Sequence, residues 1–358
     1  MQAPRWPASA RAPASPALPE RPTLTLPARA AHAGAAVSHP EHYPDWPLIE
    51  AAQARIAPHV LHTPVLRSSS LDALTGARLY FKCETFQKCG AFKARGAANA
   101  VLALSEAQAR RGVATHSSGN HGAALARAAA LRGIPAYIVM PDNSPEAKRA
   151  AVRRYGGQIR LCASTLAARE QAARELLAST GATFVHPYDD ALVMAGQASV
   201  AVEFLAEVPQ LQVLICPVGG GGLLGGCAVA SAHLAPRLEV LGAEPEGAAD
   251  AAASLHSGQL QPMPAPQTIA DGLRGALSAR TFAAIRAHVA DILTVSDPAI
   301  IEGMRELWSV LKILVEPSGA VPYAALRSCA ARFAGRDVGI VLSGANLDLE
   351  RLPWAAAR

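Results

Sequence analysis

The sequence predicts an α/β protein built from two open parallel-sheet domains with a cleft between them. From Trp46 onward, short runs of β-branched and other apolar residues alternate with longer segments of helical periodicity. This alternation is typical of parallel sheets, because each crossover between parallel strands needs a helix-length connection. Nine such strands are many for a single sheet in a chain of 358 residues, which favours two domains.

The expected strands follow one another through the whole of this region. Each is a short apolar or β-branched run bounded by Gly, Pro or polar residues. They occupy residues 79–83, 112–116, 136–140, 158–162, 183–186, 212–218, 238–243, 292–295 and 338–342. Most of the segments between them are rich in Ala, Leu, Arg and Glu, which favour helices.

The first part of the chain differs from the rest. Residues 1–47 are crowded with Pro and Ala and show no apolar periodicity. They lack the apolar core of a secretory signal, so we expect a disordered tail or a start assigned too early, with an Arg-containing transit peptide as the alternative. We expect residues 48–104 and 188–352 to form a large cofactor-binding domain and residues 105–187 a small one.

The charge of the chain gives little support for a nucleic-acid or membrane partner. Its 33 basic and 28 acidic residues leave a net charge of +5, and no basic run is longer than two residues. The apolar residues 213–235 contain Pro217 and six glycines, which indicates a buried strand, a loop and a packed helix rather than a membrane span. The six cysteines lack C-x-x-C spacing, so we expect reduced thiols in a cytoplasmic protein.

Lys93 is the first candidate for chemistry. The chain has only five lysines and otherwise uses arginine for positive charge. Lys93 lies among small residues in Gly90-Ala91-Phe92-Lys93-Ala94-Arg95-Gly96, at the start of a helical pattern. A helix N-terminus disfavours an ammonium group, which would lower the pKa of the lysine and prepare it for a Schiff base. The alternative is an ordinary first-turn lysine.

A glycine-rich loop is the second candidate. Gly219, Gly220, Gly221 and Gly222 follow a buried strand and precede a helix, so several backbone N–H groups can point at one anion. We expect a phosphate there. Gly220, Gly222 and Gly225 also match G-x-G-x-x-G, so a nicotinamide-dependent oxidoreductase is an alternative, although this position late in the chain does not suit a leading dinucleotide domain.

Two further polar loops follow predicted strands. Thr115-His116-Ser117-Ser118-Gly119-Asn120-His121-Gly122 leads into a helix, and its hydroxyl and N–H groups suit a carboxylate. A well-capped helix is the alternative. Ser343-Gly344-Ala345-Asn346 ends the last strand, where ligands of open α/β sheets gather. The histidines are not spaced as metal ligands, and neither Ser117 nor Ser118 lies in a G-x-S-x-G elbow.

These features belong to a set of motifs that occurs in a known family. The motifs are Phe81-Lys82-Cys83-Glu84, Phe86-Gln87-Lys88-Cys89-Gly90-Ala91-Phe92-Lys93-Ala94-Arg95-Gly96, Ser117-Ser118-Gly119-Asn120-His121-Gly122, Pro217-Val218 with the four glycines, Thr268-Ile269-Ala270-Asp271-Gly272, Val315-Glu316-Pro317-Ser318-Gly319-Ala320 and Leu342-Ser343-Gly344-Ala345-Asn346. Over residues 49–352 the chain resembles the threonine dehydratase and serine racemase family, which comprises pyridoxal-phosphate enzymes of fold type II, related to the tryptophan synthase β subunit.

The resemblance implies how the cofactor is held. Lys93 would bind pyridoxal 5′-phosphate covalently and serve as the catalytic base, while Phe92 and Asn120 would contact the ring and its 3′ oxygen. The glycines of residues 219–222 would bind the phosphate. Ser343 would meet the pyridine nitrogen, and a hydroxyl at that position favours elimination over transamination.

The resemblance also implies how the substrate is bound. Ser117, Ser118, Asn120 and His121 would hold the carboxylate of a small amino acid. Ser118 matches the second catalytic residue of racemases, on the face opposite Lys93. A homo-oligomer, either a dimer or a tetramer, is expected, without a nucleic-acid or membrane partner.

The reaction that the resemblance implies is a β-elimination. We expect an ammonia-lyase of the carbon–oxygen lyase class that converts L-threonine or L-serine to a 2-oxo acid and ammonia. A serine racemase with dehydratase side activity and a dehydratase of another 3-hydroxy amino acid are the alternatives, and retention of Lys93 disfavours a non-catalytic amino-acid-binding relative. Cys89, Ala91 and Ala198 depart from the family's usual threonine, serine and glycine, which leaves the substrate open.

A metal site is a further implication of the resemblance. Glu244, the carbonyl of Ala248 and Asp250 match a divalent-cation site of the racemase-like branch. Oxygen ligands suit magnesium or calcium. A solvated turn between a strand and a helix is the alternative.

Overall fold

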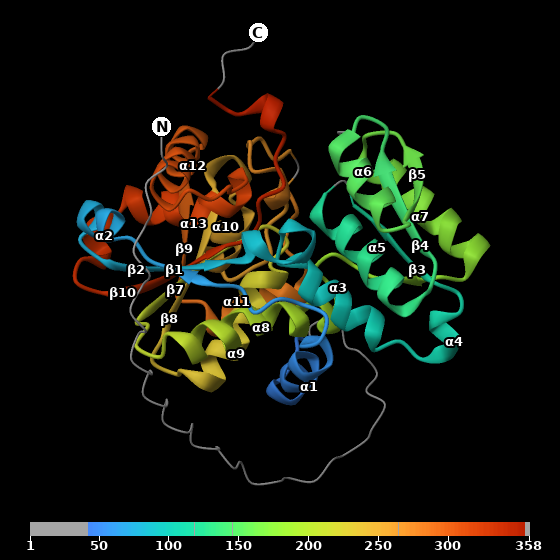
Figure 1. The fold of residues 1–358 in the computed structure, drawn as a ribbon, viewed down its shortest axis with the longest axis horizontal. Helices are drawn as coiled ribbons and strands as arrows, with labels where there is room; N and C mark the ends of the chain where they lie inside the picture. Colours follow the sequence, from blue (N-terminus) through green and yellow to red (C-terminus); the bar gives the residue numbers. More distant parts are fainter. Residues whose placement is uncertain (1–41, 118, 145, 264, 355–358) are drawn as a thin grey trace, which may run out of the picture. The chain divides into compact units, whose positions relative to one another are not determined.

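The computed structural model describes residues 42–354 except 118, 145 and 264, and these residues form two lobes, each built on its own sheet. The large lobe contains six strands and the small lobe four (Figure 1). The predicted α/β class with two open sheets is therefore confirmed. The elements of the four-stranded sheet all fall within residues 105–187, whereas the predicted tail ends just inside helix α1; the domain limits themselves stay a prediction.

The nine predicted strands are all present, with small shifts at their ends. The large sheet has the order β1 (Val65–Leu66), β2 (Arg78–Cys83), β10 (Asp337–Leu342), β7 (Val213–Pro217), β8 (Glu239–Pro245) and β9 (Asp291–Val295). The small sheet has the order β5 (Gln158–Cys162), β4 (Ala136–Pro141), β3 (Val113–His116) and β6 (Thr183–Phe184). Strand β1 was not predicted, because two residues show no alternation, and it is the one described strand that pairs antiparallel.

Helices cover both faces of each sheet. Their bounds are α1 (Trp46–Ile56), α2 (Ser69–Thr75), α3 (Lys93–Leu102), α4 (Glu106–Ala109), α5 (Asn120–Arg132), α6 (Glu146–Arg154), α7 (Leu166–Thr180), α8 (Ala191–Glu207), α9 (Gly222–Leu234), α10 (Asp250–Ser257), α11 (Ala279–His288), α12 (Asp297–Leu311) and α13 (Pro317–Ser328). In Figure 1, α3 lies at the boundary between the two lobes, beside α8 and α5. No helix within the described part of the chain is long and apolar enough to cross a bilayer.

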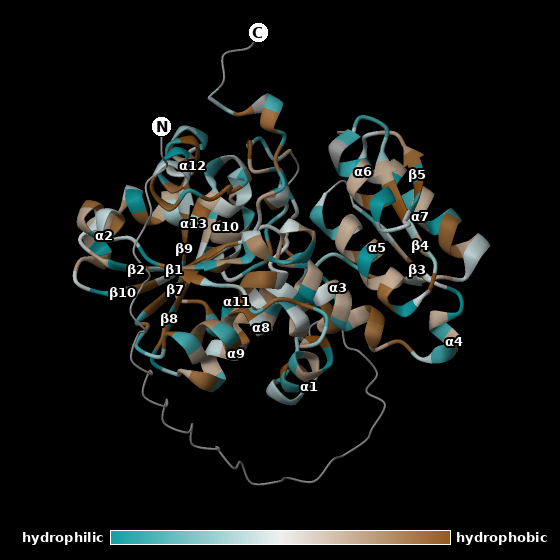
Figure 2. Ribbon diagram, in the orientation of Figure 1, coloured by the Kyte–Doolittle hydropathy of each residue, from teal (hydrophilic) through white to brown (hydrophobic). Residues whose placement is uncertain are grey.

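The core of the large lobe is divided by its sheet into two layers. Leu214 and Val341 face one layer, with α8 and α9, while their strand neighbours Ile215 and Ile340 face the other, with α12 and α13. A strand buried on both faces reads as a continuous apolar run, and the brown strands of the large sheet in Figure 2 show this. Residues 213–235 form β7, a loop and α9, as predicted.

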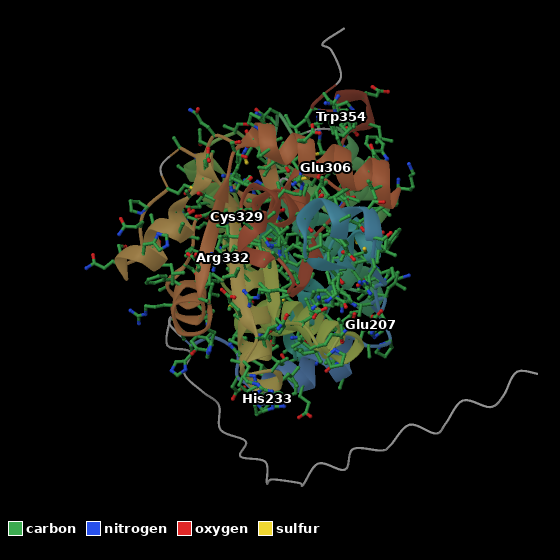
Figure 3. All side chains as sticks on the ribbon, turned by 90° about the vertical axis from the view of Figure 1, so that its left-hand side faces the viewer. Glu207, His233, Glu306, Cys329, Arg332 and Trp354 are labelled. Carbon is green, nitrogen blue, oxygen red and sulfur yellow. The ribbon has the colours of Figure 1, made fainter. Side chains whose placement is uncertain are left out.

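The two ends of the large sheet differ in chemistry. At the amino ends of β8 and β9, Arg332 (Figure 3) pairs with Glu239 and Asp291, each at 2.9 Å, on the partly exposed surface. At the carboxyl ends, the register places Leu342 beside Cys83 and Pro217 beside Ala243, so the loops that follow these strands emerge together. This is the end at which parallel sheets bind ligands.

Candidate active site

Lys93 is the first residue of α3, and its amine is enclosed by protein. Its Nζ donates a hydrogen bond to the Pro187 carbonyl oxygen at 2.7 Å and lies 5.0 Å from the centroid of the Phe92 ring. No described carboxylate forms an ion pair with it. Burial lowers the pKa of this amine from 10.5 to about 8. This agrees with the predicted direction of the shift, and the cause is loss of hydration on burial.

Two backbone hydrogen bonds join the Lys93 loop to the loop after β10. Phe92 N donates to Ser343 O at 3.0 Å and Ala345 N donates to Gly90 O at 2.9 Å, and together they form an isolated antiparallel bridge between Ala91 and Gly344. Residues far apart in sequence therefore lie side by side. The buried Ser343 and the amine-bearing Lys93 are held at one edge of the sheet, as a cofactor that contacts both would require.

The glycine loop runs from the end of β7 into the first turn of α9, and most of it is buried. A Cβ atom at Gly220 would collide with the Tyr188 ring, so this position has no room for a side chain. The N–H groups of the first helical turn have no partner within the helix and can receive an anion. The loop thus has the form that phosphate binding needs.

The segment from His186 to Tyr188 connects this loop with Lys93. Pro187 accepts the lysine hydrogen bond, and the next residue, Tyr188, packs against Gly220. His186 Nδ1 accepts a hydrogen bond from Asp189 N at 2.8 Å, and its ring stands perpendicular to that of Tyr188 at 4.6 Å. Burial lowers the pKa of His186 to about 4, so this ring is neutral at neutral pH and fixes the segment without adding charge.

The predicted carboxylate loop leads into α5. Ser117 Oγ accepts a hydrogen bond from Gly119 N at 3.2 Å, and the Asn120 side chain is held by Glu316 and Asn346. Ser118 lies outside the described residues, so its roles as carboxylate ligand and second catalytic residue stay a prediction.

His121 has a more limited part than the sequence indicates. Its Nε2 hydrogen-bonds to the Val185 carbonyl at 3.1 Å and therefore carries the proton, which leaves the buried Nδ1 as an acceptor without a partner. Burial, and next Lys93, lower the pKa of this ring to about 3. In this tautomer Nδ1 carries no proton and cannot donate a hydrogen bond to a carboxylate. The backbone N–H groups in the first turn of α5 can donate one.

Glu244 and Asp250, expected to bind a metal, lie at the end of β8 and the start of α10. Glu244 accepts hydrogen bonds from Ala251 N and Ala252 N, and burial, then Asp250, raise its pKa to about 8. Asp250 Oδ2 accepts from Leu277 N, but its buried Oδ1 has no partner. No three His, Cys, Asp or Glu side chains of the described chain gather as metal ligands, so a cation would depend on two carboxylates and the Ala248 carbonyl.

Several residues that shape the site had no role in the sequence prediction. Pro187 acts through its carbonyl, which no side-chain pattern reveals. Glu316 was part of a motif only, and its place before a proline that starts a helix was the available signal. Lys148 of α6 and Asp271 form an ion pair between the lobes.

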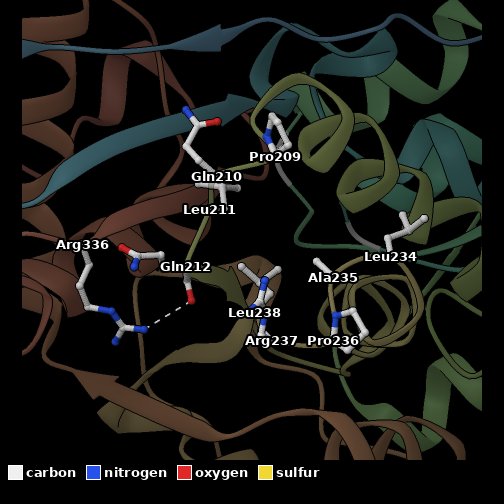
Figure 4. Close-up of a pocket in the computed structure, with 10 residues that line it drawn as sticks. All are labelled: Pro209, Gln210, Leu211, Gln212, Leu234, Ala235, Pro236, Arg237, Leu238 and Arg336. Atoms are coloured by element: carbon white, nitrogen blue, oxygen red, sulfur yellow. Dashed lines mark hydrogen bonds between the residues drawn. The ribbon is translucent and has the colours of Figure 1, made fainter. Parts of the chain in front are cut away.

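A groove elsewhere on the large lobe is separate from these residues. It is lined by polar and apolar residues of the turns before β7 and β8, with Arg336 at its side (Figure 4). This is the amino end of the sheet, where none of the predicted site residues lies. The groove therefore does not belong to the site.

The fold and the residues gathered around Lys93 fit an α/β enzyme that binds a phosphorylated aldehyde cofactor. The residues fit pyridoxal phosphate, because Lys93 offers an amine that loses its proton near neutral pH and the glycine loop offers free N–H groups where a side chain would not fit. A family profile described as "Pyridoxal-phosphate dependent enzyme" matches residues 56–344, and the chain belongs to this family.

Similar proteins include dehydratases, deaminases and racemases. A β-hydroxyaspartate dehydratase of Paracoccus denitrificans is 46% identical over 87% of this chain and 99% of its own length. A serine racemase of Oryza sativa subsp. indica is 47% identical over 84% of this chain and 90% of its own. The solved structure of a T.th. threonine deaminase superposes with a TM-score of 0.82 at 43% identity, covering 86% of this chain and 99% of the other. The protein is thus a pyridoxal-phosphate-dependent enzyme for which dehydratase and racemase activities are both plausible.

Proposed function

We propose that this protein is an ammonia-lyase that converts L-threonine or L-serine to a 2-oxo acid and ammonia by β-elimination. The observation that carries the proposal is Lys93, a part-buried amine with no carboxylate partner among the described residues, placed between the glycine loop and the Ser343 loop. A serine racemase with dehydratase side activity is the alternative. The relatives named as dehydratase, deaminase and racemase support both.

The chemistry needs a base, an anion site and an electron acceptor. Pyridoxal phosphate, when bound, supplies the electron acceptor. The Lys93 amine, oriented by the Pro187 carbonyl, is the base that takes the α proton, and its low pKa keeps a useful fraction neutral. Loss of the β-hydroxyl as water leaves an enamine, and water then releases ammonia and the 2-oxo acid.

The other residues have positioning tasks. The glycine loop would hold the phosphate, and the start of α5 with Ser117 and Asn120 would hold the substrate carboxylate. Ser343 would offer a hydroxyl rather than a carboxylate to the ring nitrogen, which would leave that nitrogen mostly neutral. A less stabilised carbanion favours prompt loss of the leaving group, which supports elimination.

Arg169 favours a second candidate substrate class, 3-hydroxy amino acids with a second carboxylate. Its Nε is buried without a hydrogen-bond partner, and no described acid forms an ion pair with it. Burial, and next the Arg169 charge, lower the pKa of His116, so the guanidinium lies near the carboxyl end of β3. An unpaired guanidinium there suits a side-chain carboxylate, and one relative is named a β-hydroxyaspartate dehydratase.

The lysine linkage tests the proposal most directly. Borohydride treatment of the yellow holoprotein should fix the cofactor on Lys93, as identified by peptide mass. Lys93→Arg should lower kcat by about 10²–10⁴-fold, because arginine can neither form the link nor accept the α proton. Lys312→Arg, a change of the same kind at an exposed helix end, should leave kcat unchanged. Linkage at another lysine contradicts the proposal.

A substrate panel separates the candidates. Purified enzyme is incubated with L-threonine, L-serine, D-serine and 3-hydroxyaspartate, and both 2-oxo acid and the chirality of remaining serine are measured. Formation of 2-oxo acid from threonine or serine supports the lyase, while inversion of serine that outpaces it supports the racemase. Arg169→Gln should raise KM for 3-hydroxyaspartate by about tenfold or more, with little change for threonine. Equal effects on both substrates would remove Arg169 from substrate recognition.

A further inference from the structure

The Glu316 carboxyl is buried beside the predicted cofactor site and forms no ion pair with a basic side chain of the described residues. The residue is 4% exposed. Glu316 precedes Pro317, the first residue of α13, and its backbone N–H donates to Gly344 O at 3.0 Å. This contact places the side chain next to the Ser343-Gly344-Ala345-Asn346 loop.

Both carboxyl oxygens of Glu316 accept hydrogen bonds from amides. Oε1 accepts from Asn120 Nδ2 at 2.8 Å, and Oε2 accepts from Asn346 N at 3.1 Å. Asn346 Nδ2 in turn donates to Asn120 Oδ1 at 3.0 Å and to Cys89 O at 2.7 Å. One carboxyl thus connects α5 of the small lobe, the loop after β10 and the loop that precedes Lys93.

The space around this carboxyl is fixed. A Cβ at Gly344 would collide with Glu316 Oε1, so residue 344 has to lack a side chain for the carboxyl to lie there. The Asn120 amide has its oxygen bound by Asn346 and its nitrogen by Glu316. Its orientation is therefore determined, and one N–H of Nδ2 remains for another acceptor.

Two charged side chains face Glu316, and they pair with each other. These are Asp271 of the large lobe and Lys148 of α6. Burial first, and Asp271 second, raise the pKa of Glu316 from 4.5 to about 8, against smaller opposing effects of Lys148, Asn120 and Asn346. Near neutral pH the group is mostly a carboxylic acid.

We propose that Glu316 is a positioning residue which, as a neutral acid, orients the Asn120 amide and the Ser343 loop for the cofactor, and that its ionisation weakens cofactor binding. The inference rests on the proposed function, in which Asn120 meets the 3′ oxygen of the cofactor. That oxygen is a phenol oxygen, which is negative when ionised. An ionised Glu316 on the same amide would place a second negative charge close by, and like charges in a buried site repel strongly.

Cofactor titration tests this role without using activity. Full-length apoprotein is titrated with pyridoxal phosphate between about pH 6.5 and about pH 9.5, and Kd is read from visible absorbance. The wild type should bind about tenfold more weakly for each pH unit above about pH 8. Glu316→Gln should stay within about tenfold of the wild type at neutral pH and lack this alkaline loss. Glu306→Gln, at a partly buried acid bound to Arg327 and Tyr323 (Figure 3), should behave as the wild type.

Loss of the Lys93 proton cannot account for weaker cofactor binding at alkaline pH. Rising pH neutralises its amine and favours the covalent link, which is the opposite direction. Alkaline weakening in Glu316→Gln equal to that of the wild type would overturn the proposal.

Unfolding of the apoprotein gives an independent measurement. Because the folded state raises the pKa of Glu316, the wild type should lose stability relative to Glu316→Gln as pH rises from about 4.5 to about 8. A difference in Tm between these two proteins that does not change over this range would overturn the neutral-acid state. The unfolding measurement does not depend on the cofactor. Failure of the Glu316 proposal would appear in it, whereas failure of the proposed function would appear as cofactor linkage at a residue other than Lys93.

Discussion

Lys82 on β2, which is fully buried, and Lys93 on α3, which is partly buried, have opposite surroundings. The Lys82 Nζ donates to Glu203 Oε2 and to Thr63 O, both at 2.8 Å. Lys93 donates to the Pro187 carbonyl and forms no ion pair with an acid in the described part of the chain. Burial alone does not decide what a lysine does, because the partners that packing supplies differ between the two sites.

The same contrast exists among the buried acids. Glu84 accepts from Arg95 at 2.7 Å and from Thr63 at 2.6 Å, and Arg95 also pairs with Glu203. Glu316, by comparison, is held by amides and forms no ion pair among the described residues. Charges are thus compensated in the network that packs α3, whereas Lys93 and Glu316 have no ionic partner in the described part of the chain, although Lys148 and Asp271 pair nearby. Perturbed groups of this second kind are typical of functional sites.

Removing the paired lysine should have the largest effect on stability. Lys82→Met leaves Glu203 with Arg95 as its remaining partner in a mostly buried network. Breaking a buried ion pair lowers the free energy of unfolding by about 3–5 kcal/mol. Because Glu203 keeps Arg95 as a partner, we expect a loss near the lower end of this range. Denaturant unfolding measures it. A loss as small as that of an exposed pair, below about 1 kcal/mol, would mean that this network is not a structural unit.

The same substitution at position 93 should stabilise the apoprotein. The folded state lowers the pKa of Lys93 from 10.5 to about 8, so the charged form is penalised in the native protein below about pH 8. Lys93→Met should therefore gain at most about 3 kcal/mol near pH 7, and the gain should disappear as pH approaches about 10.5. Unfolding curves over this pH range provide the check. Destabilisation like that of Lys82→Met would erase the difference between the two sites.

Binding of a divalent cation should have the smallest effect on stability. It extends the comparison of paired and unpaired lysines to a pair of buried acids, Glu244 and Asp250. If calcium or magnesium binds Glu244, Asp250 and the Ala248 carbonyl, it should raise Tm by the equivalent of about 1–3 kcal/mol at saturating concentration. The gain should grow as pH rises toward about 8, because the cation needs ionised carboxylates and Glu244 holds its proton up to that range. Asp250→Asn should abolish it. An equal gain in that variant would place the cation elsewhere.

Much of the site was open to prediction because its residues lie next to secondary-structure boundaries. Lys93, the glycine loop and Ser343 each follow a strand or start a helix, where sequence signals are strongest. Pro187 and Glu316 were not predicted to act, because their roles arise from contacts with residues about one hundred positions or more away. Strand β1 was missed for its shortness, and the His121 tautomer depends on one backbone carbonyl.

The sequence by itself determined the α/β class, the nine predicted strands and the places of the candidate loops at their ends, since periodicity and turn residues are local properties. Only the tertiary structure decided which charges are compensated. The sequence singles out Lys93 by its small neighbours, but it does not show that folding brings Glu203 to Lys82 and only a carbonyl of the described residues to Lys93. Proton affinity depends on hydration and neighbouring charge, and long-range packing sets both.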